Sequence, residues 1–194
     1  MKTKSVMIVG VGGQGSLLAS RILGHVFQAE GFDVKVSEVH GMSQRGGSVV
    51  TYIKYGEKVY SPIVERGEAD YILSFEQLEA ARWVSYLKKD GVMVASTQKI
   101  DPMPVITGAA VYPQEIFSRI QQLGVNLLEV EALDLARQAG SLKATNTVLI
   151  GVLSVLMPFA KEKWEDAIRQ IAPTQFVELN LRAFSLGREA ACSK

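Results

Sequence analysis

Hydrophobic residues near the start of the chain change their spacing at a cluster of glycines. Residues 5–9 form a short apolar run, which is typical of a buried strand. After the glycines, apolar residues recur at helical spacing from Ser16, and Gly31 stands where a helix would end. Alternating apolar and polar residues over 32–36 then predict a second strand. The first part of the chain is therefore expected to form a strand–helix–strand unit.

The next stretch predicts an antiparallel hairpin and a return to regular alternation. Residues 48–55 are rich in β-branched and aromatic residues, Gly56-Glu57 can turn, and 58–63 can return as the partner strand. Short apolar runs predict three further strands, at 71–73, 91–95 and 126–130.

Helices are predicted between these later strands. Ser74 and Gln77 have the spacing of a capping box, which favours a helix that reaches about Leu87. Pro113 is suited to the first position of another helix, which Gly124 would end.

From Glu131 onward the pattern is helical. The apolar run 148–159 follows Asn146, which we expect to be its N-cap. An amphipathic helix precedes Pro173, and another is predicted over 174–188. The predicted fold class is α/β, with a mainly parallel Rossmann-like sheet, an inserted β-hairpin and a helical C-terminal portion.

Composition supports one globular domain over residues 1–194. Hydrophobic residues make up 47% of the chain and charged residues 21%. The formal net charge of +1 gives no electrostatic reason to expect a nucleic-acid partner. The apolar run 148–159 is too short to span a bilayer, and the run before Gly10 is too short for a signal peptide. We therefore expect a soluble, cytoplasmic protein that binds neither nucleic acid nor membrane.

Metal-binding chemistry has little support in the sequence. Cys192 is the only cysteine, and one thiolate by itself cannot hold a zinc ion or an iron–sulfur cluster. His25 has no Cys, Asp or second His at metal-ligand spacing, so a structural role is favoured. Glu76 and Glu79 share a helix face without an evident acid–base partner, and we expect both to be solvated. No metal site is predicted in this chain.

The glycines after the first strand match a phosphate-binding pattern. Gly10, Gly12 and Gly15 fit G-x-G-x-x-G, placed between a strand and a helix as that pattern requires. Glu38 stands about 20 residues farther on, where a ribose-binding carboxylate would lie. Glycines let a backbone approach a ligand, and the N–H groups at a helix start attract phosphate. The candidate cofactor-binding residues are therefore Gly10, Gly12, Gly13, Gln14 and Gly15. The alternative is that the glycines only permit a tight turn and close packing.

A second candidate site follows the second strand. Residues 37–48 gather hydrogen-bonding side chains among glycines, and Arg45 can bind a phosphate or carboxylate with two parallel hydrogen bonds. This segment replaces the helix that an ordinary dinucleotide-binding fold has here, which disfavours an NAD enzyme. The candidate substrate- or partner-contacting residues are Glu38, His40, Ser43, Gln44 and Arg45. The alternative is an ordinary solvated loop.

These two motifs together resemble a known family. The sequence GVGGQG at 10–15, followed by SEVHGMSQRGGS at 37–48, resembles the γ-type domain of 2-oxoacid:acceptor oxidoreductases. Within that family it is most similar to β subunits of indolepyruvate ferredoxin oxidoreductases. The resemblance continues through Asn146-Thr147 and 178–184, so it covers essentially the whole chain.

The resemblance implies a division of labour between subunits. In this family an arylpyruvate and coenzyme A, the cosubstrate, give an arylacetyl-CoA, carbon dioxide and reduced ferredoxin. The larger α subunit carries thiamine diphosphate with Mg and the Fe–S clusters. The resemblance therefore implies that the present chain holds none of these groups, is inactive alone, and has the larger subunit and ferredoxin as partners.

Two other functions remain open at this stage. Gly10, Gly12, Gly15 and Glu38 also suit an autonomous NAD-binding Rossmann-type oxidoreductase or sensor. The chain can also be a non-catalytic assembly subunit whose glycine turn is purely structural. The sequence does not identify the 2-oxoacid substrate.

Overall fold

The protein is built around one six-stranded sheet. The computed structural model describes residues 3–38 and 46–192. In spatial order the strands are β2 (Asp33–Glu38), β3 (Ser48–Gly56), β1 (Lys4–Val11), β4 (Ala69–Ser74), β5 (Leu87–Ser96) and β6 (Asn126–Val130).

The sheet is mixed, with a parallel half and an antiparallel half. Strands β1, β4, β5 and β6 pair in parallel, whereas β3 runs antiparallel to both β1 and β2. The predicted α/β class with an inserted hairpin is confirmed, but the hairpin is formed by β2 and β3. The prediction of a return strand at 58–63 was wrong, because β1 and β2 already occupy both edges of β3.

Strand β3 also separates the two strands of the predicted strand–helix–strand unit. Helix α1 (Ser16–Ala29) connects β1 to β2, and these strands point the same way, but they do not pair. Since neighbouring strands lie about 4.7–4.9 Å apart, β2 is displaced from β1 by roughly 9–10 Å. The carboxyl ends of β1 and β2 are therefore not adjacent in the sheet.

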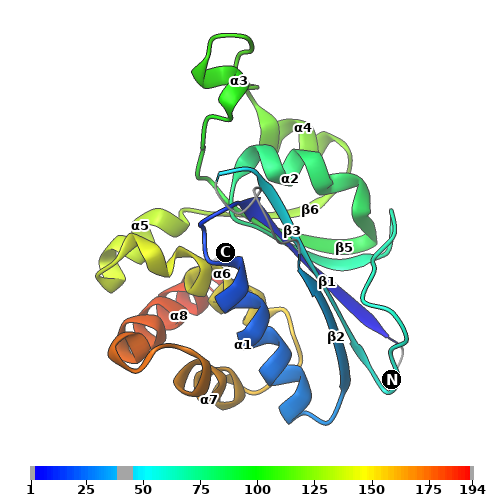
Figure 1. Ribbon diagram of the computed structural model, residues 1–194, viewed down its shortest axis with the longest axis vertical. Helices are drawn as coiled ribbons and strands as arrows, with labels where there is room; N and C mark the ends of the chain where they lie inside the picture. The colour runs from blue at the N-terminus through cyan, green and yellow to red at the C-terminus, as the bar shows by residue number, and fades with distance from the viewer. Residues whose placement is uncertain (1–2, 39–45, 193–194) are drawn as a thin grey trace.

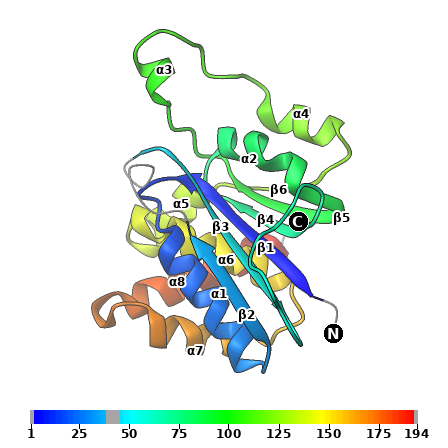
Figure 2. The same ribbon diagram turned by 45° about the vertical axis from the view of Figure 1, so that its right-hand side comes forward.

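Helices cover both faces of the sheet (Figures 1 and 2). Alternate residues of β1 enter different cores: Val6 and Ile8 face one helical layer, while Met7 and Val9 face the other. The smaller layer contains α2 (Gln77–Trp83) and α4 (Ile116–Gln122). The larger layer contains α1 with α5 (Ala132–Ala139), α6 (Thr145–Val155), α7 (Lys161–Ile171) and α8 (Val177–Cys192). In both views the short helix α3 (Met103–Ile106) projects away from these layers.

Helices α6 and α8 cross at two glycines. A Cβ atom added to Gly151 would overlap the carbonyl oxygen of Phe184, and one added to Gly187 would overlap that of Val148. Both obstacles are backbone atoms, so no side-chain rotation could relieve them. The predicted apolar helix is therefore buried on nearly every side, and its backbone lies directly against that of α8.

Several predicted helix ends are shifted in the structure. Helix α2 is capped by Glu76, whose carboxylate accepts a hydrogen bond from the Glu79 N–H at 2.9 Å, and not by Ser74. It is followed by the 3-10 turn η2 (Val84–Tyr86), and β5 already begins at Leu87. Helix α4 starts after Glu115, beyond the predicted Pro113, because Glu115 adopts a left-handed backbone with φ of 56°.

The C-terminal helices follow the prediction with similar shifts. Helix α6 begins at Thr145, after the 3-10 turn η3 (Leu142–Ala144), so Asn146 lies inside its first turn instead of capping it. Helix α8 begins at Val177, because Thr174–Phe176 form the 3-10 turn η4. No helix among residues 3–38 and 46–192 is long and apolar enough to cross a membrane.

Candidate functional site

The glycine turn connects the carboxyl end of β1 to the first turn of α1. Gly13 and Gly15 have φ angles of +100° and +86°, in the left-handed region that side chains with a Cβ rarely adopt. The N–H of Gly12 donates to the Gly47 carbonyl at 2.8 Å. The residue that precedes β3 therefore lies directly against the turn.

Gln14 links the turn to two other strand ends. Its Oε1 accepts from the Val11 N–H at 2.7 Å. Its Nε2 donates to the Phe75 carbonyl and to Oε1 of Gln98, each at 3.0 Å. Phe75 follows β4 and Gln98 lies just after β5. One amide side chain thus joins the carboxyl ends of three parallel strands, the edge at which open α/β sheets bind ligands.

Gly10 has a structural role in this arrangement. A Cβ atom at this position would lie 2.8 Å from Gln14 Oε1 and 3.1 Å from Phe75 Cβ. The first glycine of the motif is therefore needed for close packing around the Gln14 side chain. Gly10 is the second-to-last residue of β1 and so lies just before the turn in the chain.

Asn146, in the first turn of α6, also contacts the glycine turn. Its Nδ2 donates to the Gly15 carbonyl at 3.0 Å, and its Oδ1 accepts from the Thr147 N–H at 2.7 Å. Thr147 in turn donates from Oγ1 to Oδ1 of Asn180 at 2.6 Å. Asn146 is only 2% exposed, so its amide is committed to this network. The sequence predicted Asn146 only as a helix N-cap, and its hydrogen bond to the glycine turn was not predicted.

A cavity of about 570 Å³ opens beside the turn. Gly13, Gln14 and Gly15 form one wall, and α1 begins there without a side-chain cap. Leu142 and Lys143 also line the cavity and contribute an apolar and a cationic group. Since uncapped N–H groups and a nearby cation attract negative charge, the cavity suits an anionic group attached to an apolar body.

Comparison with known proteins places this arrangement in a family. The family model described as pyruvate ferredoxin/flavodoxin oxidoreductase matches residues 5–190. The chain belongs to this family. It is 43% identical to "Indolepyruvate oxidoreductase subunit IorB" of Thermococcus kodakarensis, over 98% of this chain and 97% of the relative. The resemblance inferred from the two motifs is thereby confirmed.

Solved structures of lower identity share the fold. The gamma subunit of a keto/oxoacid ferredoxin oxidoreductase from Geobacter sulfurreducens has a TM-score of 0.74 at 23% identity, covering 98% of this chain and 99% of its own. A 2-oxoglutarate:ferredoxin oxidoreductase from Magnetococcus marinus has a TM-score of 0.76 at 18% identity. The present chain aligns over its full length to 32% of that longer chain. The same fold therefore occurs both as a separate subunit and as one part of a larger polypeptide.

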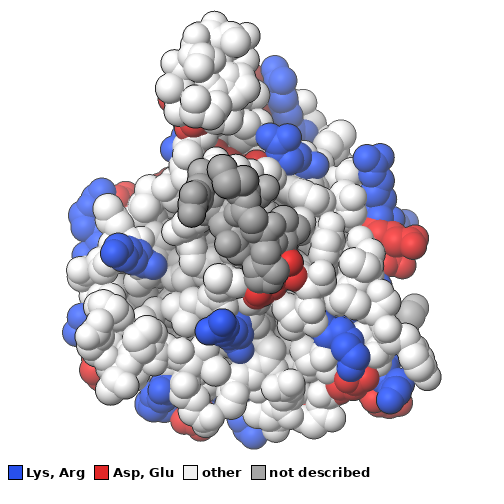
Figure 3. Space-filling view, viewed as in Figure 1, with Lys and Arg blue, Asp and Glu red and all other residues white. Residues whose placement is uncertain are grey.

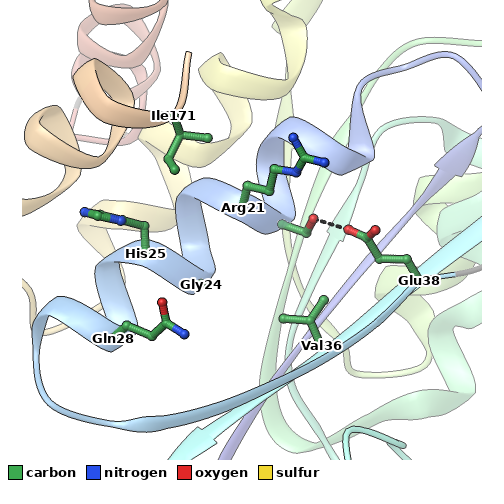
Figure 4. Close-up of a pocket in the computed structure, with 8 residues that line it drawn as sticks. Arg21, Gly24, His25, Gln28, Val36, Glu38 and Ile171 are labelled. Atoms are coloured by element: carbon green, nitrogen blue, oxygen red, sulfur yellow. Dashed lines mark hydrogen bonds between the residues drawn. The ribbon is translucent and has the colours of Figure 1, made fainter. Parts of the chain in front are cut away.

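Glu38 lies apart from the glycine turn. It ends β2 and accepts a hydrogen bond from the hydroxyl of Ser20 on α1 (Figure 4). It lines a different, open depression of about 410 Å³, together with Arg21 and His25. Because β3 lies between β1 and β2, this carboxylate does not stand where a ribose-binding carboxylate lies next to a glycine turn. The geometry therefore weakens the NAD-binding alternative.

The remaining residues of the second candidate site fall on a segment that the structure does not cover. His40, Ser43, Gln44 and Arg45 lie outside the described residues. The chain resumes at Gly46, and Gly47 contacts the glycine turn through its carbonyl.

Glu76 and Glu79 are buried, so the expectation that both are solvated was wrong. They are 1% and 4% exposed. Glu79 accepts hydrogen bonds from the Ser48 hydroxyl, from Arg82 Nε at 3.1 Å and from Trp83 Nε1 at 3.2 Å. Within the described residues, the hydrogen-bonding partners of both carboxylates are donors, which indicates a structural role for both.

No group of three or more metal-ligating side chains is found in the parts of the chain that the structure describes. Cys192 is exposed at the end of α8. His25 is a partly buried residue of α1.

Proposed function

We propose that this chain is the small subunit of an indolepyruvate ferredoxin oxidoreductase. The observation that carries the proposal is the 43% identity, over nearly the full length of both chains, to a protein named as a subunit of indolepyruvate oxidoreductase. In the proposed reaction an arylpyruvate loses carbon dioxide, and its remaining acyl group forms a thioester with coenzyme A. One proton is released, and the two electrons removed from the substrate reduce ferredoxin.

The cofactors of this reaction are proposed to reside on the larger subunit. Thiamine diphosphate, when bound there with Mg, supplies the electron sink for decarboxylation, and the Fe–S clusters supply a path for electrons. The present chain offers a single cysteine, exposed at the end of its last helix, which suits neither role. We therefore propose a cytoplasmic heteromer in which residues 1–194 act as one domain that completes the active site.

The glycine turn is proposed to receive an anionic group. Gly13 and Gly15 would present backbone N–H groups to a coenzyme A phosphate or to the partner's cofactor region. The N–H groups of Gly12 and Gln14 already donate to the Gly47 and Val11 carbonyls, so these two residues would shape the turn instead. Three observations support this: the cavity beside the turn, the uncapped start of α1 and the nearby Lys143. Gly10 contributes by packing beneath Gln14.

The segment that ends at Gly47 is proposed to form the partner-facing side of this site. Arg45 and Gln44 would donate hydrogen bonds to the anionic group, and His40 would orient the segment. Ser43 belongs to the same proposed surface, whereas Glu38, at the end of β2, lines a separate depression beside α1 and is not included in it. The contact between the Gly47 carbonyl and the Gly12 N–H supports this placement, because it brings the end of the segment to the turn.

Separating the two subunits tests the division of labour. The complex would be purified, and each chain analysed for thiamine, iron and visible absorption. We expect the present chain to be colourless and free of thiamine. A stoichiometric cofactor on this chain, or binding of NAD to it, would contradict the proposal and favour the autonomous oxidoreductase.

A further inference from the structure

Residues 99–115 form an arm that projects from the body of the protein. It follows Gln98 and carries α3 (Figures 1 and 2). Its side chains are unusually exposed for their hydrophobicity: Met103 is 66% exposed, Ile106 65% and Val111 85%. Residues 102–114 contain no charged side chain, and the tip of the arm is uncharged in Figure 3. Exposed apolar groups gathered in this way mark an interaction surface.

Both ends of the arm are fastened to one buried carboxylate. Glu76 Oε1 accepts from the Ile100 N–H at 3.2 Å and from the hydroxyl of Tyr112. Burial of the phenol and the adjacent Glu76 carboxylate raise the pKa of Tyr112 above its usual range, so the hydroxyl remains a donor. The Lys99 ammonium lies 5.9 Å from the centre of the Tyr112 ring. The arm is thus held at its base while its tip stays free of the body.

The arm is also ordered by its own hydrogen bonds. The Val105 N–H donates to the Pro102 carbonyl at 2.8 Å, and the Thr107 N–H donates to that of Met103 at 2.9 Å. The Ala110 N–H closes the turn on the Pro104 carbonyl at 2.9 Å. The exposed apolar side chains are therefore presented on a formed structure, so docking would not have to order the arm first.

The arm rises from the same edge of the sheet as the candidate site. Gln98, the residue before the arm, bonds to Gln14 and lines the cavity at the glycine turn. Glu76, which anchors the arm, follows Phe75 at the end of β4. A protein that covers the arm would therefore lie along the edge that carries the glycine turn.

We propose that this arm docks into an apolar socket on the larger, cofactor-bearing subunit, an inference that rests on the proposed function. The absence of charge over residues 102–114 calls for an apolar partner surface. The Magnetococcus marinus chain contains the same fold within a polypeptide about three times as long, so this fold does occur joined to further protein. A membrane is a poor occupant, because Asp101 and Glu115 flank the uncharged stretch and outnumber Lys99, so the arm offers anionic lipid headgroups no net attraction.

Substitutions at the tip test the proposal on the full-length chain. Ile106→Asp and Val111→Asp would be titrated against the purified larger subunit by calorimetry. Leu123→Asp is the matched control, since Leu123 is 70% exposed but lies beside Leu87 and Asn126, at the amino ends of β5 and β6, whereas the arm follows the carboxyl end of β5. We expect each arm variant to weaken binding by at least about thirtyfold, as at an interface hot spot. The control should bind like the wild type, and all three should keep the thermal midpoint of the free wild-type chain.

The outcomes separate this proposal from the proposed function. If the wild-type chain assembles into an active complex and the arm variants bind equally well, the docking proposal is overturned and the proposed function stands. If the wild-type chain binds no thiamine-bearing subunit, both fail. If the free chain self-associates and Ile106→Asp abolishes that association, the arm serves a second copy and the proposal is also overturned.

Discussion

Nε2 of Gln14 donates a hydrogen bond to Oε1 of Gln98 across 3.0 Å, although 84 positions separate the two residues in the sequence. The same nitrogen donates to the carbonyl of Phe75. Two side-chain amides thus hold the ends of β1, β4 and β5 in a fixed relation around the cavity. The position of the glycine turn therefore depends on the Gln14 hydrogen bonds as well as on the backbone conformations that its glycines allow.

Gln14→Glu should disrupt that relation. A carboxylate oxygen would replace Nε2 and face the Phe75 carbonyl oxygen, which can only accept, so that hydrogen bond would become a repulsive contact. The Gln98 amide would have to turn over and donate its Nε2 to keep its own contact. We expect the free energy of unfolding to fall by about 1–3 kcal/mol in urea denaturation at pH 7. Gln28→Glu, on the exposed surface of α1, is the control and should change it by less than about 0.5 kcal/mol. Equal effects for the two variants would show that the amide network is unimportant.

The close crossing of α6 and α8 predicts that a substitution at Gly187 lowers the stability of the protein, and a second glycine provides a control that is expected to raise it. Gly187→Ala should destabilise the protein by at least about 2 kcal/mol, because the new methyl group overlaps the Val148 carbonyl oxygen. Gly24→Ala, on α1, meets no atom within 4 Å and should stabilise the protein by about 0.5–1 kcal/mol. Thermal denaturation of both variants would measure the contrast. A neutral Gly187→Ala would mean that the helices can separate at no cost.

Asp70 predicts a pH dependence of stability. This buried residue accepts hydrogen bonds from Lys4 Nζ at 3.0 Å, from the Ser5 N–H at 2.9 Å and from Lys88. Burial alone would raise the pKa of Asp70, but the hydrogen bonds from Lys88, Lys4 and Ser5 together hold it below its usual value of 3.8. The resulting stabilisation is present above pH 3.8 and is lost as the pH falls through the lowered pKa.

Asp70→Asn tests this dependence directly. At pH 7 we expect the variant to be less stable than the wild type by about 1.5–3 kcal/mol, the contribution of hydrogen bonds to a charged group. The difference should shrink as the pH is lowered below 3.8, because the wild-type carboxyl then becomes neutral as well. Asp134→Asn, at an exposed pair with Arg137, should show no such change. A difference that stays constant with pH would contradict the assignment.

Arg45 is expected to act through the reaction and not through the fold. Arg45→Ala in the reconstituted complex should lower turnover or coenzyme A affinity by more than about tenfold, the scale of one lost charge-assisted hydrogen bond. Arg137→Ala, on the exposed surface of α5, serves as the control for loss of one positive charge. Wild-type kinetics and normal assembly for both Arg45→Ala and His40→Ala would show that the segment is ordinary surface.

Local pattern predicted most of the elements but not their partners. The strand at 126–130 and the helix from Ser16 were predicted at their observed positions, because their apolar spacing and flanking glycines are local signals. The hairpin was assigned to the wrong pair of strands, since the pairing of β3 depends on contacts with β1 that no local signal encodes. The burial of Glu76 was missed because two of its partners, Ile100 and Tyr112, lie 24 and 36 positions farther along the chain.

At the candidate site, too, the sequence predicted the local motif but not the contacts between residues that are distant in the chain. The glycine pattern located the turn and its cavity-lining residues Gly13 and Gly15. Asn146 was missed, because it reaches Gly15 across 131 positions and its short polar side chain near a helix start resembles an ordinary cap. The separation of Glu38 from the turn follows from the insertion of β3, a feature of sheet order and not of motif spacing.

We propose that this chain works only within a larger oxidoreductase, and a reconstitution assay with separately purified subunits is the decisive test. The purified chain, the larger subunit and their mixture would each receive indolepyruvate, coenzyme A and oxidised ferredoxin, and ferredoxin reduction would be followed by absorbance. We predict no reduction by this chain alone and substrate- and coenzyme A-dependent reduction by the mixture, at a rate well above that of the larger subunit. Full activity of the larger subunit without this chain, or NAD-dependent turnover by this chain alone, would contradict the account.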